Sequence, residues 1–229
     1  MGDFVIRPYQ SADRQSVRNI CYETGFMGEP VDWLWPDKES FADLFTIYYT
    51  DVEPESAFVV EAISDDRTGD SRQPNKIIGY LTGCIDTRKI PSHIDIAFKH
   101  LFMRALPLRP SMARILWRSA RDIVVDAVAM HTLLQNELID PRWPSHLHID
   151  LLPEARGKGV GRMLIDTWIN RLVEVGSPGC HLRTLAENHN AIKFFETVGF
   201  SKWGDPTPVP GFRTRQLERM HVQSMVRPL

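Results

Sequence analysis

A strand-like alternation followed by a glycine-rich turn restricts the fold of this chain more than any other feature. From His146 to Leu152 polar and apolar residues alternate, which predicts a strand with one polar and one apolar face. Pro153 has no N–H for a sheet ladder and should end the strand. Apolar residues then recur at helical spacing, which predicts a helix of about four turns. These residues are Val160, Leu164, Trp168, Leu172 and Val175.

The turn between these two elements has the properties of a phosphate site. The N-terminus of a helix presents free backbone N–H groups and the positive end of the helix dipole. Glycines there let a phosphate approach the backbone, because no Cβ stands in the way. Arg156, Lys158 and Arg162 add positive charge to the same turn. The strand, the turn and the helix together predict a pyrophosphate site.

Two common phosphate-binding patterns do not fit the turn. The dinucleotide pattern G-x-G-x-x-G fails because its last position is Arg162 or Leu164, depending on the glycine at which it starts. The P-loop pattern fails because no Gly-Lys pair is followed by Ser or Thr. The remaining pattern is R-x-x-G-x-G, from Arg156 to Gly161. It resembles the acyl-CoA pyrophosphate loop of the GCN5-related N-acetyltransferases (GNAT).

A second block supports this resemblance. Residues 188–200, NHNAIKFFETVGF, resemble the family's later signature, an N-x-x-A helix that ends in an aromatic residue and then Gly-Phe. The likeness is close over residues 140–205 and loose elsewhere. The run from His146 to Asp150, with Pro153 and Glu154 after it, is also similar to the acetyltransferase-like C-terminal domain of O-GlcNAcases and its free-standing microbial counterparts. We find no glycoside hydrolase domain in this sequence.

The resemblance implies the GNAT fold, an α/β (α+β) architecture. Such a fold has a mixed, mostly antiparallel central sheet, with a V-shaped splay between its two central strands and helices on both faces. We expect a single domain over residues 1–229. An extra helical insert, at about residues 87–144, would precede the central strand.

The same resemblance implies that acetyl-CoA is the cosubstrate and lies in the V between the central strand and the next one. Backbone groups near Leu151 and Leu152 would contact the pantetheine, the glycine loop would hold the pyrophosphate, and Asn188 would contact the pantetheine from the later helix. Many family members have a tyrosine as general acid where this chain has Phe195, and a phenyl ring cannot donate a proton. The expected cosubstrate residues are Leu151, Leu152, Arg156, Gly157, Lys158, Gly159, Val160, Gly161, Arg162, Asn188 and Phe195.

Transfer of an acyl group to an amine requires a base, because only the neutral amine attacks. Asp150 and His148 are the candidates, since they share the polar face of the predicted strand near the thioester end. Histidine titrates near neutral pH, whereas an aspartate needs its pKa raised by burial. Structural hydrogen bonds are the competing interpretation for both side chains. A metal site formed with His181 is a minor alternative, and we predict no metal.

The other elements are predicted from periodicity and turn residues. We expect strands at 4–8, 57–63, 77–85, 180–185 and 217–225. We expect helices after Ser11, at 41–49, from Ser92, from Ser111 and at 188–198. Residues 26–38, 64–75 and 204–211 are expected to be loops, the last because it contains three prolines. By the resemblance, loop 26–38 would line the acceptor site.

The insert is the main departure from a minimal family member. Its helix from Ser111 carries apolar residues at roughly helical spacing, and such a surface must pack against something. It would cover the acceptor side of the sheet or form a homodimer contact. The apolar residues are Met112, Ile115, Leu116, Ile123, Val124 and Val128.

Composition argues against several functional classes. A net charge of −2 creates no field that would attract nucleic acid or an anionic membrane. The N-terminus does not resemble a signal peptide, and no apolar stretch is long enough to span a bilayer. Cys21, Cys84 and Cys180 are far apart and odd in number, so we expect buried free thiols and a reducing, cytoplasmic location.

Two functional hypotheses follow. The first is an N-acyltransferase that transfers an acetyl group from acetyl-CoA directly to an amine acceptor, namely a small amine, an amino acid or a peptide. The second is a catalytically weak or inactive acyl-CoA-binding protein that works as a sensor or scaffold, which Phe195 favours. The intact glycine loop argues against decay of the cosubstrate site. Protein binding through the helical insert alone is a weaker third hypothesis.

Overall fold

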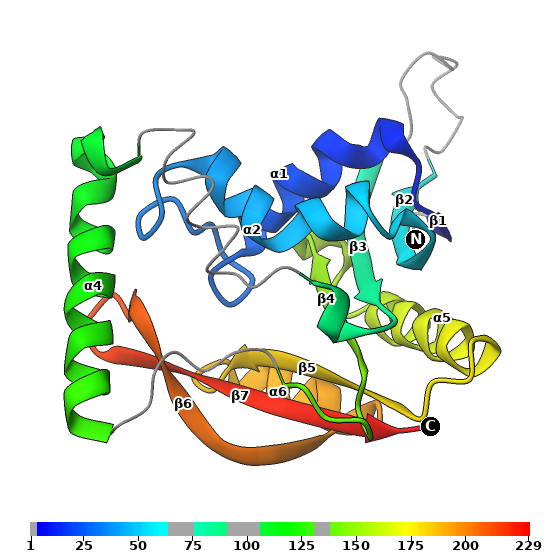
Figure 1. The fold of residues 1–229 in the computed structure, drawn as a ribbon. Coiled ribbons are helices and arrows are strands. Elements are labelled where there is room, and N and C mark those ends of the chain that lie inside the picture. Colours follow the sequence, from blue (N-terminus) through cyan, green and yellow to red (C-terminus); the bar gives the residue numbers. More distant parts are fainter. Residues whose placement is uncertain (1–3, 64–75, 91–105, 131–137) are drawn as a thin grey trace, which may run out of the picture.

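One seven-stranded sheet forms the centre of the molecule (Figure 1). The computed structural model describes residues 4–63, 76–90, 106–130 and 138–229. The strands are β1 Phe4–Pro8, β2 Ala57–Ala62, β3 Lys76–Cys84, β4 Ser145–Leu151, β5 Gly179–Leu185, β6 Ser201–Arg213 and β7 Arg219–Pro228. They lie in the order β1-β2-β3-β4-β5-β7-β6. Among the described strands only β4 and β5 are parallel neighbours, so the mixed, mostly antiparallel sheet confirms the predicted fold class.

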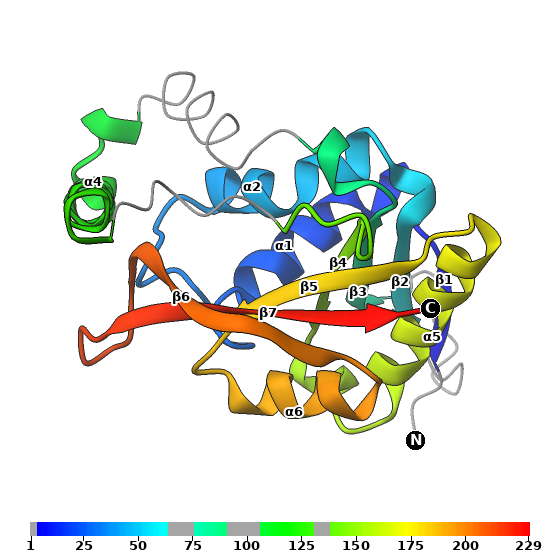
Figure 2. The same cartoon turned by 60° about the horizontal axis from the view of Figure 1, so that its bottom comes forward.

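Helices cover both faces of the sheet (Figure 2). The α-helices are α1 Arg14–Thr24, α2 Lys38–Asp51, α4 Pro110–Met130, α5 Val160–Glu174 and α6 His189–Thr197. Short 3-10 turns are η1 Ser11–Asp13, η2 Pro54–Ser56, η4 Thr87–Lys89, η5 Leu106–Leu108 and η6 Pro153–Ala155. α1 and α2 lie on one face and α5 and α6 on the other, while α4 stands beside the ends of β6 and β7 (Figures 1 and 2).

β4 separates two apolar cores, as its alternating sequence predicts. Leu147 is buried in the core that α5 and α6 cover, where it lies in one cluster with Leu164 and Trp168. On the opposite face, Tyr80 of β3 belongs to the core under α1, together with Ile20. The strand therefore directs its apolar side chains to α5 and its polar ones to α1 and α2.

The contact between α5 and the sheet depends on a glycine in β3. Trp168 is fully buried, and a Cβ placed on Gly83 would lie 2.3 Å from its ring. The indole can rest on β3 only because that position has no side chain. Gly83 pairs with Leu147 in the β3–β4 ladder, so the glycine lies in the middle of this core.

The stripe predicted for the helix from Ser111 is wrong, because it joined two different faces of α4. Met112 and Ile115 are buried, whereas Val124 is 62 % exposed and Val128 is 75 % exposed. Spacing in the sequence shows which residues are apolar but not where a neighbouring surface ends. The helix predicted from Ser92 lies outside the described residues.

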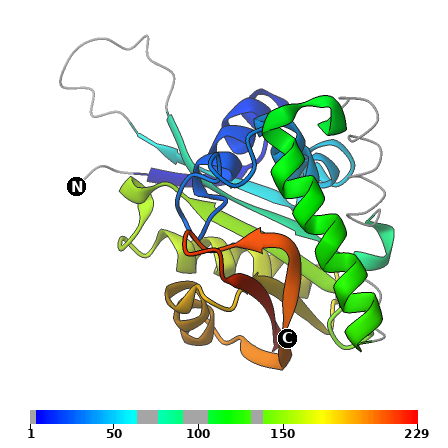
Figure 3. The same cartoon turned by 90° about the vertical axis from the view of Figure 1, so that its left-hand side faces the viewer.

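α4 lies beside β6 (Figure 3), and a buried carboxylate joins the two elements. Asp122 accepts one hydrogen bond from the backbone N–H of Gly211 at 2.9 Å and another from Arg213 at 2.6 Å. The side chain of Ser119 lies close by, so close that a Cβ on Gly211 would clash with it. α4, the helix of the insert, thus packs on β6 at one end of the sheet.

Residues 204–211, predicted to be a loop, instead lie inside β6. β6 is the outermost strand, and its pairing with β7 shifts register between Trp203 and Thr207 and again between Pro208 and Arg213. Prolines are tolerated on an edge strand and at such irregularities because the missing N–H faces no partner. The prediction failed because a proline-rich segment does not reveal that it lies at a sheet edge.

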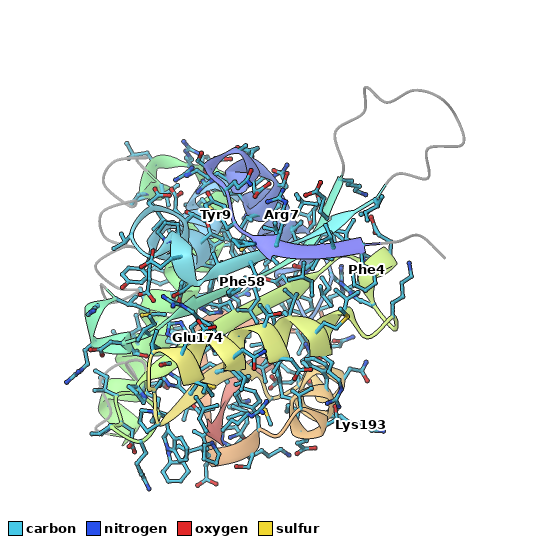
Figure 4. The ribbon with its side chains drawn as sticks, turned by 90° about the vertical axis from the view of Figure 1, so that its right-hand side faces the viewer. Phe4, Arg7, Tyr9, Phe58, Glu174 and Lys193 are labelled. Atoms are coloured by element: carbon cyan, nitrogen blue, oxygen red, sulfur yellow. The ribbon has the colours of Figure 1, made fainter. Side chains whose placement is uncertain are left out.

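β1 forms the other edge of the sheet and is tied down by an arginine (Figure 4). Arg7 donates two hydrogen bonds to Asp13, at 2.7 and 2.8 Å, and another to Glu61 on β2. Asp13 also accepts from the N–H of Gln10. The helix predicted after Ser11 begins at Arg14, and Ser11 itself lies in the turn η1.

Within the described part of the chain, no helix combines the length and the apolar character that crossing a bilayer requires.

Candidate active site

β4 and β5 separate after a short stretch of pairing, and this separation opens the site. Their register contains only Ser145 with Cys180 and His146 with His181. β4 stays paired with β3 as far as Leu151, and β5 stays paired with β7 along its length. The strands therefore part in the middle of the sheet, and among the residues that the structure describes no strand pairs with the second half of β4 on the β5 side.

Two residues form the β4 edge that faces this splay. In an antiparallel ladder, alternate residues direct both backbone groups to the same neighbour. The N–H of Leu152 donates to the carbonyl of Ile78 at 2.9 Å, so the even-numbered residues face β3. Ile149 and Leu151 therefore direct their backbone groups toward β5, where the carbonyl of Leu151 accepts from Arg156. Both backbone groups of Leu152 are occupied, since its carbonyl accepts from Ala155.

The glycine loop lies directly after this edge and begins α5. Gly157 and Gly159 have positive φ angles, +72° and +78°, which side chains disfavour. A Cβ at either position would meet no atom within 4 Å, so the backbone conformation, not crowding, requires glycine. Gly161 differs, because a Cβ there would lie 3.0 Å from the ring of Phe194 on α6. Val160, the first residue of α5, is fully buried.

The N-terminus of α5 has no side-chain cap among the described residues. Its first N–H groups thus have no side-chain acceptor there, and the pyrophosphate site at this helix N-terminus stays a prediction. Of the nearby cations, Lys158 is exposed and forms no ion pair in the described part of the chain. Arg162 donates to the carbonyl of Thr197 at 2.9 Å, and Arg156 donates to two backbone carbonyls.

Asp150 lies on the α1 side of β4 and is hydrogen-bonded to a tyrosine. The hydroxyl of Tyr80, its partner across the β3–β4 ladder, donates to the carboxylate at 2.5 Å. Burial raises the pKa of Asp150, and hydrogen bonds from Tyr80 and Thr24 and the charge of Arg156 only partly oppose that rise. A carboxylate with a raised pKa has the property that proton abstraction near neutral pH requires.

His148 belongs to a layer of rings beneath α2. The ring of His146 lies 5.2 Å from that of His148 and 5.5 Å from that of His181, and it is hydrogen-bonded to the hydroxyl of Tyr49. His181 in turn is hydrogen-bonded to a backbone carbonyl through Nδ1. Among the described residues, no group of His, Cys, Asp and Glu side chains is arranged to hold a metal ion.

The later signature lies in α6. The side-chain oxygen of Asn188 accepts from the N–H of Ala191 at 3.1 Å and so caps the helix. Phe195 is only 7 % exposed and packs in the core against Phe194 and Phe200. No hydroxyl stands at the position where many family members have their tyrosine.

Sequence reasoning missed the partners of the two candidate bases. In the sequence, Tyr80 is one residue of a predicted apolar strand, and Tyr49 is the last residue of a predicted helix. Their roles depend on the β3–β4 register and on the docking of α2, which link residues far apart in the chain. No local pattern carries that information.

Residues 26–200 match the model of the Acetyltransferase (GNAT) family. Among solved structures, the crystal structure of SsHAT has 26 % sequence identity and a TM-score of 0.66, over 99 % of this chain and 98 % of that one. A GNAT superfamily phosphinothricin acetyltransferase from Sinorhizobium meliloti, in complex with AcCoA, has 17 % identity and a TM-score of 0.52, over 99 % and 88 % of the two chains. The family match spans most of the sequence, and we conclude that this chain belongs to the acetyltransferase (GNAT) family.

Proposed function

We propose that this protein is an acetyl-CoA-dependent N-acetyltransferase, which transfers an acetyl group from acetyl-CoA to an amine. The observation that carries the proposal is the open edge of β4, which leads directly into an uncapped helix N-terminus with two left-handed glycines. An extended amide chain fits the edge, and a pyrophosphate fits the helix N-terminus. Acetyl-CoA carries both groups in one molecule.

In this proposal the pantetheine lies along Ile149 and Leu151, and the pyrophosphate lies at residues 157–161. Leu152 was expected to contribute, but its backbone groups bond to Ile78 and Ala155. The carbonyl of Leu151 bonds to Arg156, so the backbone of Ile149 and the N–H of Leu151 would contact the pantetheine. Lys158 is exposed, donates to no carbonyl of the described residues as Arg156 and Arg162 do, and would contact a phosphate oxygen. Asn188 begins α6 across the splay, and its amide group would face the pantetheine.

The chemical step joins the amine nitrogen to the acetyl carbon and breaks the bond between that carbon and sulfur. The amine must lose a proton, and Asp150 or His148 on the polar face of β4 would accept it. We favour Asp150, since burial raises its pKa. The CoA thiolate leaves and takes up a proton from water, because Phe195 has none to donate.

One observation favours a second function, binding of acyl-CoA without efficient catalysis. Phe195 is packed into the core, so its position offers no proton donor to the leaving thiolate. A protein of this kind would act as a sensor or scaffold. The amine acceptor, a homodimer, a cytoplasmic location and the narrower resemblance to O-GlcNAcase domains remain predictions.

Calorimetric titration with acetyl-CoA and CoA, followed by a free-thiol assay on a panel of amines, amino acids and peptides, tests the proposal. Binding with acceptor-dependent thiol release would establish the acetyltransferase. Binding without release across the panel would favour the sensor or scaffold. If neither acetyl-CoA nor CoA binds, the assignment of the cosubstrate site is wrong.

A further inference from the structure

The guanidinium of Arg156 bridges two segments that are distant in the sequence. Its Nε donates to the carbonyl of Leu151 at 2.9 Å, at the end of β4. Its Nη2 donates to the carbonyl of Gly28 at 2.7 Å, in the segment between α1 and α2. Hydrogen bonds from a charged donor are stronger than those between neutral groups. One side chain thus joins the edge of the splay to residues 26–35.

The turn that Arg156 contacts has a conformation that its sequence does not favour. Phe26 and Glu29 exchange two backbone hydrogen bonds of 2.9 Å, and the two residues between them have positive φ angles. Gly28, at +88°, adopts this backbone readily, but Met27, at +53°, does not. A turn with a disfavoured residue needs support from outside itself, and Arg156 supplies a hydrogen bond to it.

From this turn, ring contacts continue toward the turn between β6 and β7. The ring of Phe26 lies edge-on to that of Trp33, with centroids 4.9 Å apart. The guanidinium of Arg215, in the turn between β6 and β7, lies 4.9 Å from the ring of Trp33. Residues 26–35 therefore form a wall between the end of β4 and the end of the β6–β7 hairpin.

We propose that Arg156 is a positioning residue, which holds the Met27–Gly28 turn against the end of β4 and thereby fixes this wall of the acceptor site. The inference rests on the proposed function only in calling the space an acceptor site. Two N–H groups of Arg156 donate to backbone carbonyls. The positive charge near the pyrophosphate would then come from Lys158 and from the N-terminus of α5.

Hydrogen exchange and calorimetry on the same variants separate the two roles. In Arg156→Ala, the amides of residues 26–31 should exchange about tenfold faster than in the wild type, because the turn loses its external hydrogen bond. Its affinity for acetyl-CoA should stay within about threefold, because the charge is not on the phosphates. Lys158→Ala is the matched control, with weaker acetyl-CoA binding and unchanged exchange in residues 26–31.

A rescue variant tests the mechanism directly. Asn-Gly suits a turn with two positive φ angles, so Met27→Asn should make the turn stable by itself. In Arg156→Ala/Met27→Asn, exchange at residues 26–31 should return toward the wild-type rate. If Arg156 acted only through its charge on a bound phosphate, Met27→Asn would not change the exchange of residues 26–31 in the Arg156→Ala background.

The proposal is overturned if Arg156→Ala leaves the exchange of residues 26–31 unchanged, or if it weakens acetyl-CoA binding as much as Lys158→Ala does. Exchange is measured on the protein without acetyl-CoA. Failure of the wild type to bind acetyl-CoA would therefore refute the proposed function, while the exchange results would still decide the role of Arg156.

Discussion

At the scale of the residue, Asp150 combines a partly buried carboxylate with a place on the strand that borders the splay. Burial disfavours its charged form, and the hydroxyl of Tyr80 lowers that cost only in part. Asp122, at the other end of the molecule, is also desolvated, but hydrogen bonds from Arg213 and the Gly211 N–H lower its pKa. The pKa values of these two carboxylates thus move in opposite directions, because only Asp122 is hydrogen-bonded to an arginine.

These pKa changes predict opposite effects of pH on stability. The pKa of Asp150 is raised in the folded protein. The free energy of unfolding therefore falls as pH rises from the unfolded pKa, about 3.9, through the folded pKa. The total fall is about 1.4 kcal/mol for each unit by which the folded pKa exceeds the unfolded one. Asp150→Asn should remove that fall and be relatively more stable at neutral pH. Asp122→Asn should be less stable at neutral pH, with the difference vanishing as pH falls. Denaturant unfolding at several pH values measures both, and equal signs would contradict the prediction.

Asp150→Asn also tests the proposed base. An amide cannot accept the proton of the amine, so turnover should fall by about 100-fold or more. Acetyl-CoA affinity should remain, because the side chain lies on the polar face of β4 and not at the glycine loop. Thiol-release kinetics with the best acceptor of the panel provide the measurement. Unchanged turnover would leave His148 as the base.

Gly159 tests the phosphate site. In Gly159→Asp, a carboxylate at the N-terminus of α5 would repel the pyrophosphate, and acetyl-CoA affinity should fall by about 100-fold, or about 2.7 kcal/mol. Gly176→Asp is the matched control, since Gly176 also has a positive φ angle, +69°, and equally open surroundings beyond the other end of α5. Calorimetry should show normal acetyl-CoA binding for the control. Normal binding by Gly159→Asp would show that the loop does not hold the pyrophosphate.

At the scale of the element, α5 is positioned by what lies under it. Its buried face includes Val160, Leu164 and Trp168, as the periodicity predicts, whereas Val175 lies beyond the helix and is 38 % exposed. The position of the helix N-terminus relative to β4 depends on the fit of the Trp168 ring against Gly83. The phosphate site and the splay are thus related through this core contact.

Gly83→Ala should disturb that contact. Its new Cβ would lie 2.3 Å from the rigid ring of Trp168, and overpacking of this kind costs about 1–3 kcal/mol. Gly79→Ala in the same strand should cost less, because the nearest atom is the end of the flexible Leu151 side chain. Denaturant unfolding measures both free energies. A larger loss for Gly79→Ala would contradict the packing argument.

At the scale of the whole molecule, the sheet extends beyond the segment that matches the family. That segment, residues 26–200, lacks β1, α1, β6 and β7. β7 is not an edge strand, since it lies between β5 and β6, and α4 packs on β6. The parts outside the match therefore complete one side of the site and hold the insert.

A chain shortened to residues 26–200 should not fold on its own. It would expose the edges of β2 and β5 and the buried faces of α4 and β5, so we expect no cooperative unfolding transition. Circular dichroism during thermal unfolding, with the full chain as control, provides the measurement. A sharp transition near that of the full chain would contradict this view.

What the sequence alone determined is local. The alternation from His146 to Leu152, the glycine turn and the periodicity of α5 predicted a strand, a turn and a helix, and the structure has all three. Each prediction depends on residues within one or two turns of one another, where the period of the side chains reports directly on the backbone. The fold class followed from the resemblance that these motifs carry.

Only the tertiary structure decided how the site is assembled. The splay depends on where β5 separates from β4. The environment of Asp150 depends on its pairing with Tyr80 across the β3–β4 ladder. Arg156 donates to the carbonyl of a residue 128 positions away in the chain. Phe195 was expected near the cosubstrate, and its place in the core became visible only with Phe200 packed against it. These features arise from contacts between distant segments, and a periodicity read along the chain carries no information about which distant segment will become the neighbour.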